Sequence, residues 1–264
     1  MPEKPAPATR ILNCIPSRDV EKDWDITNAT SSGLAAASGP LPTSVDLRES
    51  WWKVGDQRDT GSCVGWAVAD SVLRWHFAKV GRIKKADRLS VRYLWMAAKE
   101  MDPFVSRPTT FIEVEGTSIK TALDIARKYG IVLDALVPFL KALLYRGDTS
   151  TFYAIAANLR IASYFNLNRD QHNWRTWLAN SGPIVTRLNV DATWDHAADT
   201  AGNLDVYRPE TGRGGHAVAL VGYTLDRFIV RNSWGEAWGK DGFGFASLEY
   251  ARDAFTEAYG VHVV

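Results

Sequence analysis

Cys63 combines a residue type and a sequence setting that suit a nucleophile. It follows Gly61 and Ser62 at the point where a helical pattern begins, and the unpaired amides and dipole of a helix start favour a thiolate. Gly61 lets the backbone approach a ligand closely. Gln57, six residues upstream, could donate from its side-chain amide to an oxyanion that forms near the sulfur. A free cysteine is more often a small buried apolar residue, so Cys63 alone leaves both interpretations open.

A thiol nucleophile needs a base, and the chain has five histidines. His76 lies on the same predicted helix as Cys63, about 20 Å away by helical rise, and cannot turn back to the thiol. His216 follows a Gly-Gly pair and opens an apolar strand pattern, so a rigid element would hold its ring while small neighbours leave room beside it. We therefore favour His216 as the base, with a structural histidine as the alternative. The other histidines lie in polar, loop-like sequence or near the C-terminus: His172, His196 and His262.

These residues belong to three blocks that follow one another along the chain. The blocks are Gln57 with Gly61-Ser62-Cys63, then Gly215-His216-Ala217, then Asn232-Ser233-Trp234-Gly235 with Trp238-Gly239. Their order and spacing resemble the papain and cathepsin family of cysteine peptidases. The resemblance extends over residues 43–264 and is strongest at the three blocks. Thr60 and Val64 depart from the family, which usually has Cys and Trp at these positions, and Trp66 could replace the missing Trp.

The resemblance implies a role for each reacting group. Cys63 would attack a peptide carbonyl as a thiolate paired with protonated His216, and His216 would then protonate the leaving amine. Asn232 would accept a hydrogen bond from the other imidazole N–H and fix the orientation of the ring, and Trp234 would cover that bond. Gln57 and the backbone N–H of Cys63 would form an oxyanion hole.

By the same resemblance, a second set of residues would line the substrate cleft. Gly116 and Thr117 fall where the family hydrogen-bonds the extended substrate backbone, and Ala217 falls on a wall of the main specificity pocket. Arg187 falls where an apolar pocket residue is usual. Its charge would favour an acidic substrate side chain, unless the side chain points to solvent. The expected substrate-binding residues are Gly116, Thr117, Arg187, Ala217, Trp234 and Trp238.

The pattern of apolar residues predicts the elements that must position these groups. Helical spacing predicts helices over residues 63–80, 91–101 and 118–129, the first of them buried and carrying Cys63 in its first turn. β-rich runs punctuated by Gly and Pro predict strands over residues 184–188, 217–223 and 227–231. Helices first and strands later favour an α+β protein with two lobes.

The resemblance implies how the two lobes are arranged. A helical lobe over roughly residues 50–160, with the Cys-bearing helix at its centre, would pack against a β-barrel-like lobe over roughly residues 161–264. The active site would lie in the cleft between the lobes. Together they would form a papain-like peptidase domain over residues 43–264.

Residues 1–42 differ from this expected domain. They open Pro-rich and close with a run of small residues that is typical of a flexible linker. Between these two parts lies an apolar patch over residues 11–15, and the residues that connect it to the expected domain are numerous enough for it to reach a groove. We expect this pro-like segment to lie in the active-site cleft and to reduce activity, and a disordered tail is the alternative. A disulfide between Cys14 and Cys63 is the least favoured possibility.

Composition argues against several other classes of protein. A formal net charge of +1 gives no electrostatic reason to expect nucleic acid or an anionic membrane as a partner. Asp134 and Lys141 interrupt the best candidate for a membrane span, residues 131–144. The N-terminus lacks the apolar core of a signal peptide, so we expect a soluble protein that is cytoplasmic or exported without a cleaved signal. Histidines and cysteines without ligand spacing, and the lack of a phosphate-binding Gly motif, predict no metal and no cofactor.

We therefore expect a bacterial, papain-like cysteine endopeptidase. It would hydrolyse peptide or protein substrates through a covalent acyl-enzyme and would be restrained by its own N-terminal segment. A catalytically silent peptide-binding module is one alternative, and the intact Cys63, His216, Asn232 and Gln57 argue against it. An acyl or peptidyl transferase is another, because it would share the acyl-enzyme and differ only in the acceptor.

Overall fold

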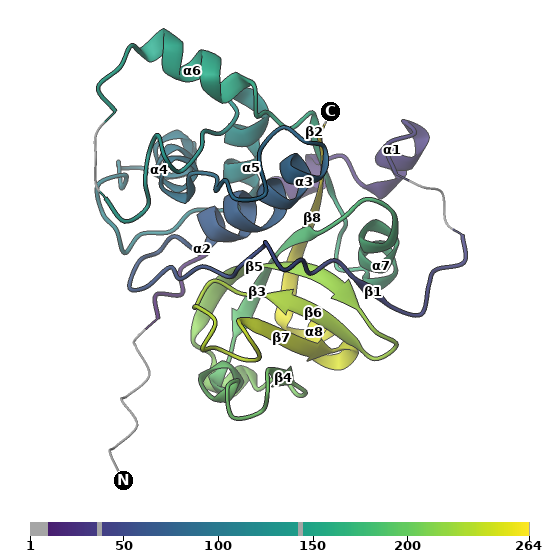
Figure 1. The fold of residues 1–264 in the computed structure, drawn as a ribbon. Coiled ribbons are helices and arrows are strands. Elements are labelled where there is room, and N and C mark those ends of the chain that lie inside the picture. The colour runs from purple at the N-terminus through teal and green to yellow at the C-terminus, as the bar shows by residue number, and fades with distance from the viewer. Residues whose placement is uncertain (1–9, 36–38, 142–144, 264) are drawn as a thin grey trace.

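A computed structural model describes residues 10–35, 39–141 and 145–263 of the chain (Figure 1). Helices dominate the first part of the chain and strands the second, which confirms the α+β class. The helices are η1 (Val20–Lys22), α1 (Ile26–Ser31), α2 (Cys63–Gly65), η2 (Trp66–Leu73), α3 (Arg74–Lys79), α4 (Val91–Met101), α5 (Ile119–Lys128), α6 (Thr149–Ala157), α7 (Gln171–Asn180), η3 (Ala192–His196), η4 (Pro209–Thr211) and α8 (Leu248–Ala254). The strands are β1 (Val45–Asp46), β2 (Ser163–Asn166), β3 (Ile184–Val190), β4 (Asn203–Leu204), β5 (Gly214–Tyr223), β6 (Arg227–Arg231), β7 (Phe243–Ser247) and β8 (Phe255–His262).

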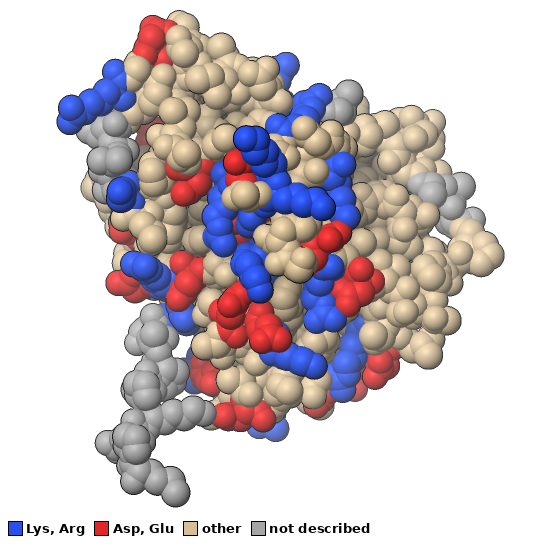
Figure 2. All heavy atoms as spheres, in the orientation of Figure 1, with Lys and Arg blue, Asp and Glu red and all other residues tan. Residues whose placement is uncertain are grey.

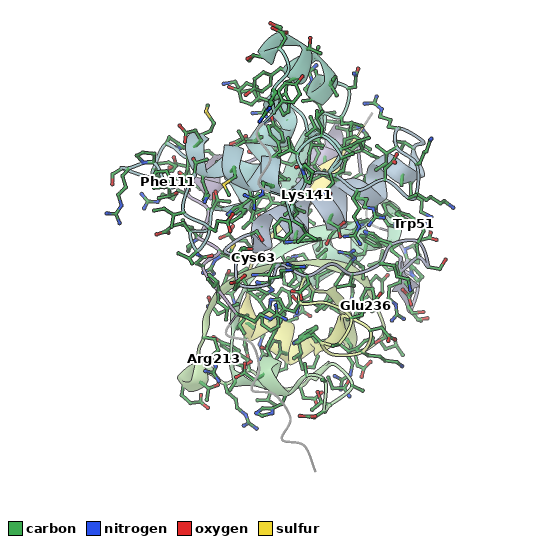
Figure 3. The ribbon with its side chains drawn as sticks, turned by 60° about the vertical axis from the view of Figure 1, so that its left-hand side comes forward. Trp51, Cys63, Phe111, Lys141, Arg213 and Glu236 are labelled. Atoms are coloured by element: carbon green, nitrogen blue, oxygen red, sulfur yellow. The ribbon has the colours of Figure 1, made fainter. Side chains whose placement is uncertain are left out.

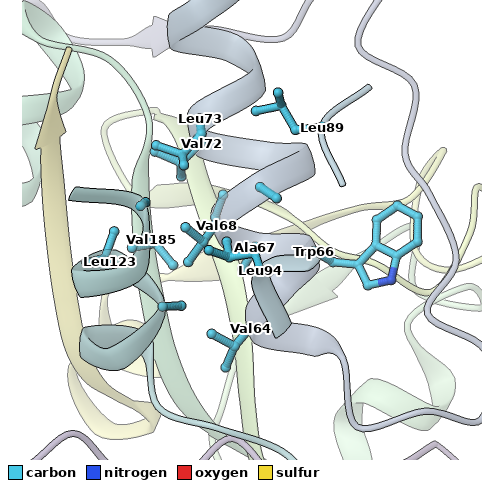
Figure 4. Packing of buried hydrophobic residues seen from close by; sticks show 14 of the residues in the cluster. Val64, Trp66, Ala67, Val68, Val72, Leu73, Leu89, Leu94, Leu123 and Val185 are labelled. Carbon is cyan, nitrogen blue, oxygen red and sulfur yellow. The ribbon is translucent and has the colours of Figure 1, made fainter. Parts of the chain in front are cut away.

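The helix that starts at Cys63 runs between the other helices and the sheet (Figure 1). Its three parts, α2, η2 and α3, follow one another without a break, which confirms the predicted helix, but η2 has π-helical hydrogen bonds that the sequence pattern did not predict. Every residue of η2 is buried. Its aliphatic side chains lie beside Leu94 of α4, Leu123 of α5 and Val185 of β3 (Figure 4). Burial on several sides, worth about 25 cal/mol per Å² of apolar surface, fixes the element that carries Cys63.

The two helices that pack on this central helix begin at serine caps. The Ser90 hydroxyl accepts a hydrogen bond from the Tyr93 amide, and the Ser118 hydroxyl accepts one from the Thr121 amide. Such caps satisfy amides that a helix start leaves unpaired. The helices predicted over residues 91–101 and 118–129 are confirmed as α4 and α5.

The described strands form one eight-stranded sheet, in the order β2-β8-β3-β5-β6-β7-β4 with β1 paired to β5. The three predicted strands are confirmed as β3, β5 and β6, and β5 is longer at its start than predicted because Gly214, Gly215 and His216 belong to it. Glycine is a weak strand former, so the pattern gave no signal there. The register places His216 opposite Leu188 and Ala217 opposite Arg187. A second hydrophobic core lies against the sheet and includes residues of α7 and α8.

Part of the N-terminal region is built into this body. Ala29 of α1 is fully buried in the second core. Asp23 forms an ion pair with Lys120 at 2.5 Å and accepts a hydrogen bond from the Tyr259 hydroxyl at 2.9 Å. The residues from Asp23 to Ala29 are therefore anchored in the body of the protein.

The surface carries charges of both signs. On the face shown in Figure 2, basic and acidic side chains are interspersed, as expected for a formal net charge of +1. Within the described ranges, the helices are too short or too polar to cross a membrane.

Candidate active site

Cys63 lies at the first turn of the central helix, between the helices and the sheet (Figure 3). Its side chain is fully buried. The neighbouring Cys14 thiol, and then the imidazole of His216, hold the pKa of the Cys63 thiol well below its usual value, against the opposing effect of burial. A lowered pKa increases the fraction of thiolate, which is the nucleophilic form.

His216 on β5 has different surroundings at its two ring nitrogens. Nε2 lies 2.8 Å from Oδ1 of Asn232, and the same oxygen accepts the Ser233 amide at 2.8 Å. Because an amide oxygen only accepts, Nε2 carries the proton. Nδ1 is buried and has no hydrogen-bond partner among the described residues. Nδ1 is therefore the nitrogen that can exchange a proton with Cys63.

Tryptophan rings enclose this imidazole. The Trp234 ring lies 5.0 Å from the His216 ring at 35°, and the Trp194 ring lies 5.6 Å from it, edge to face. Trp238 packs on Trp194 at 4.8 Å and donates its indole N–H to the Trp194 carbonyl at 2.9 Å. Excluding water strengthens the bond between His216 and Asn232. Trp194 was not predicted from the sequence, because it lies on the short helix η3, which shows no periodic pattern.

Gln57 is fully buried and held at both ends of its amide. Its Oε1 accepts a hydrogen bond from the Ser233 hydroxyl at 2.8 Å. Its Nε2 donates to the carbonyl of Thr60 at 3.0 Å and to the carbonyl of Ile11 at 3.3 Å. The donor expected to serve an oxyanion thus already points at a carbonyl of the N-terminal segment.

This N-terminal segment, residues 10–17, threads between the start of α5 and the start of β5. The Cys14 amide donates to the Gly215 carbonyl at 2.9 Å, and the Ile15 amide donates to the Thr117 carbonyl at 3.1 Å. Glycines make room for it: a Cβ on Gly116 would lie 2.1 Å from the carbonyl oxygen of Asn13, and a Cβ on Gly215 would lie 2.5 Å from that of Cys14. The segment therefore packs against the backbone around the site and shares a buried cluster with Cys63.

The residues expected to bind substrate differ in how they meet this segment. Gly116 and Thr117 contact it through the backbone, and Arg187 donates from Nε to the Cys14 carbonyl at 3.1 Å. Arg187 is only 8% exposed, so its side chain does not point to solvent. The other three expected residues lie nearby in different ways. The Ala217 backbone helps to lower the pKa of the Cys63 thiol, the Trp234 carbonyl accepts a hydrogen bond from Arg10 at 3.2 Å, and the Trp238 ring packs on Trp194.

A buried charge network that the sequence did not reveal lies behind the site. Asp70 of η2 forms ion pairs with Arg231 at 2.9 Å and with Arg74 at 3.2 Å. Arg231 directly precedes Asn232 and also donates to the Ser71 hydroxyl at 2.5 Å. The network therefore joins the helix of Cys63 to the chain that presents Asn232.

The described residues contain no group of three or more His, Cys, Asp or Glu side chains that could hold a metal ion. The side chains that the site brings together are the Cys63 thiol, the His216 imidazole and the amides of Gln57 and Asn232. Such a set suits acyl transfer through a covalent thioester.

Comparisons with known proteins agree with this geometry. The family model described as papain family cysteine protease matches residues 41–255. Cathepsin B-like CP3 of Giardia intestinalis is 29% identical over 81% of the chain and 72% of its own length, and Macrodontain-1 of Ananas macrodontes is 28% identical over 77% and 87%. Xylellain, a cysteine protease from Xylella fastidiosa, has a similar fold, with a TM-score of 0.77 at 21% identity over 96% of both chains. The procathepsin B S9 of Trypanosoma congolense has a TM-score of 0.67 at 18% identity, over 95% of this chain and 86% of its own.

Proposed function

The chain belongs to the papain family of cysteine proteases, and we propose that Cys63 is its nucleophile and His216 its general base and acid. The observation that carries this assignment is that the two imidazole nitrogens of His216 have different hydrogen-bonding surroundings. Nε2 is bonded to Asn232 at 2.8 Å, and Nδ1 has no hydrogen-bond partner in the part of the chain that the structure describes and lies near a thiol with a lowered pKa. This is the arrangement that a thiolate–imidazolium pair requires.

The proposed reaction follows from these contacts. The Cys63 thiolate attacks the carbonyl carbon of a peptide bond, and the Cys63 backbone N–H and the Gln57 amide stabilise the oxyanion. The oxyanion collapses, the C–N bond breaks, and the leaving amine takes the proton from Nδ1 of His216. A water molecule then gives a proton to Nδ1 and attacks the thioester carbon. The new carboxyl group leaves and the thiolate is restored.

The N-terminal segment must leave before this reaction can begin. It covers Cys63, and the Gln57 amide donates to its Ile11 carbonyl. We assign residues 10–17 the role of an autoinhibitory segment, within a regulatory region of residues 1–42. Proforms among the solved structures with a similar fold, such as the procathepsin B S9, support this role.

The substrates are peptides or proteins, and the cleft suggests how they are held. Gly116, Thr117 and Gly215 offer backbone groups and space for an extended chain, as they do for the segment. Arg187 offers a buried positive charge beside this path. An acidic side chain near the cut would therefore be favoured.

Labelling by the epoxide inhibitor E-64 tests the assignment and the restraint together. The proteins to compare are the full chain and a chain lacking residues 1–17, each with Cys63 and with Cys63→Ala. The shorter deletion is preferable to removing the whole region, because Asp23 and Ala29 are anchored in the body. If the segment fills the cleft in nine molecules of ten, its removal should raise the labelling rate about tenfold.

This experiment tests the assignment of Cys63 as nucleophile and the restraint by the N-terminal segment independently. Labelling that persists in Cys63→Ala would overturn the nucleophile assignment. Equal labelling rates in the two Cys63 proteins, both folded by circular dichroism, would remove the restraint and keep the peptidase.

A further inference from the structure

The two cysteines of the chain meet in the cleft. They lie far apart in the sequence, yet both are buried, Cys14 at 2% exposure and Cys63 at 0%. Both side chains belong to one cluster of packed buried residues, and each thiol shifts the pKa of the other. Both are free thiols in this structure.

The position of Cys14 is fixed by contacts that do not involve its sulfur. Its amide donates to Gly215 at 2.9 Å, and its carbonyl accepts from Arg187 at 3.1 Å. The next amide, that of Ile15, donates to Thr117 at 3.1 Å. The backbone is thus held on both sides of the cleft, and this hold keeps the Cys14 side chain in the buried cluster that also contains Cys63.

We propose that Cys14 and Cys63 are a site of reversible oxidative modification, at which a peroxide converts the two thiols into a disulfide that locks the autoinhibitory segment over the nucleophile. This inference rests on the proposed role of Cys63. The oxidant is hydrogen peroxide, and a small thiol or dithiol is the reductant that reverses the modification.

The two thiols have different roles in this chemistry. Burial first, and then the neighbouring Cys63 thiol, raise the pKa of the Cys14 thiol, whereas the pKa of the Cys63 thiol is lowered. Cys63 is therefore the thiolate that attacks peroxide when the segment opens transiently. The O–O bond breaks, hydroxide leaves and takes up a proton as water, and Cys63 becomes a sulfenic acid.

The segment then closes and Cys14 completes the reaction. The Cys14 sulfur attacks the sulfenic sulfur, the S–O bond breaks, and the hydroxyl leaves as water with the Cys14 proton. In total, one peroxide is reduced to two waters and two thiols are oxidised to one disulfide. The bond stops Cys63 from advancing to the sulfinic acid, which thiols do not reverse. The modification therefore inhibits the enzyme and protects its nucleophile at the same time.

The test compares the full chain with Cys14→Ser and Cys63→Ser. Each reduced protein is exposed to hydrogen peroxide at low protein concentration, alkylated, digested without reductant and analysed by mass spectrometry. In the wild type we expect a peptide pair joined through Cys14 and Cys63 that disappears with dithiothreitol. We also expect that dithiothreitol restores most peptidase activity in the wild type, whereas in Cys14→Ser much of it stays lost and Cys63 is found as a sulfinic acid.

Failure of this inference can be told apart from failure of the proposed function. The joined peptide is measured by mass, without reference to activity, and activity of the reduced proteins is measured before oxidation. Sulfinic acid at Cys63 in the wild type, with no joined peptide, would overturn the modification site. Full activity of reduced Cys63→Ser would instead overturn the role of Cys63.

Discussion

Asp70 and Arg231 form an ion pair of 2.9 Å in which neither side chain is exposed. Asp70 lies on η2, the continuation of the helix that starts at Cys63, and Arg231 ends β6 directly before Asn232. The pair thus spans from the element that carries the proposed nucleophile to the residue that orients the proposed base. A carboxylate at this place compensates the charge of two buried arginines, because Asp70 also pairs with Arg74.

We expect Asp70→Asn to destabilise the protein by about 3–5 kcal/mol, because it leaves buried guanidinium groups without a counter-charge. Urea unfolding at neutral pH measures this loss. The matched control is Asp205→Asn, which removes one ion-pair partner, at 2.7 Å, of Arg227, a residue of β6 like Arg231. Asp205 is 62% exposed, so this change should cost less than about 1 kcal/mol. Equal losses in the two variants would contradict the importance given to the buried pair.

Asn232→Ala should lower kcat/KM while the protein stays folded. The change removes the acceptor 2.8 Å from Nε2 of His216, and a hydrogen bond to a charged group is worth about 1.5–3 kcal/mol, or roughly a 10- to 100-fold loss in rate. Asn232→Asp keeps an acceptor oxygen and should lose less activity. Asn158→Ala, at the exposed asparagine that caps the end of α6, should leave kcat/KM unchanged. Unaltered kcat/KM in folded Asn232→Ala would show that Asn232 does not orient the base.

The residues that we propose to react have clearer signals in the sequence than the residues that support them. Cys63, His216 and Asn232 each lie in a short block with Gly or Trp neighbours, and such local signals do not depend on knowing the fold. The pair Asp70 and Arg231 joins residues far apart in the chain, and nothing near either residue indicates the other.

The N-terminal segment likewise combines a feature that the sequence indicates with contacts that it does not indicate. Its apolar patch predicted a place in a groove, but the contacts that hold Cys14 and Ile15 are mainly backbone hydrogen bonds and close passages beside Gly116 and Gly215. Backbone hydrogen bonds are available to any residue type, so no pattern in the sequence predicts them. The contact of Cys14 with Cys63 follows from this register and could not be derived from composition.

His76 should make stability depend on pH below neutrality. Burial lowers the pKa of His76 from 6.5 to about 4, while a hydrogen bond to the Pro183 backbone opposes the shift and His262 adds to it. The unfolded chain binds a proton at this residue as pH falls through 6.5, and the folded protein does so only near pH 4. Falling pH therefore favours unfolding across this window, by about 3 kcal/mol in total, and the full stability is present above pH 6.5.

Urea unfolding of His76→Gln between pH 7 and pH 4 checks this expectation. The variant should lose most of the pH dependence that the wild type shows in this range, whatever its stability at pH 7. His172→Gln, at an exposed histidine, is the matched substitution and should keep the wild-type slope. A slope that is the same in all three proteins would rule out His76 as its source.

The hydrogen bonds of the Arg187 side chain make its effect on substrate specificity testable. Its Nη1 donates to Thr256 at 2.8 Å and to Asn189 at 3.2 Å, and its Nε donates to the Cys14 carbonyl. When the segment leaves, the last of these partners is lost and a donor of the buried guanidinium becomes free. Glu257 is the residue opposite Arg187 on β8, and its Oε1 accepts the Ser17 amide at 2.9 Å, a bond that is lost at the same time.

These contacts predict that the chain lacking residues 1–17 cleaves peptides with Glu at the second residue before the cut faster than matched peptides with Gln. A charge-assisted bond from Arg187 is worth about 1.5–3 kcal/mol, which sets the preference at roughly tenfold or more in kcat/KM. Arg187→Gln should reduce this preference towards one while retaining cleavage of the Gln peptide, because the reacting groups are untouched. Glu257→Gln should increase the preference, since it removes the negative charge that competes for the guanidinium. Equal rates for the Glu and Gln peptides, in the parent and in Glu257→Gln alike, would exclude Arg187 as a specificity determinant.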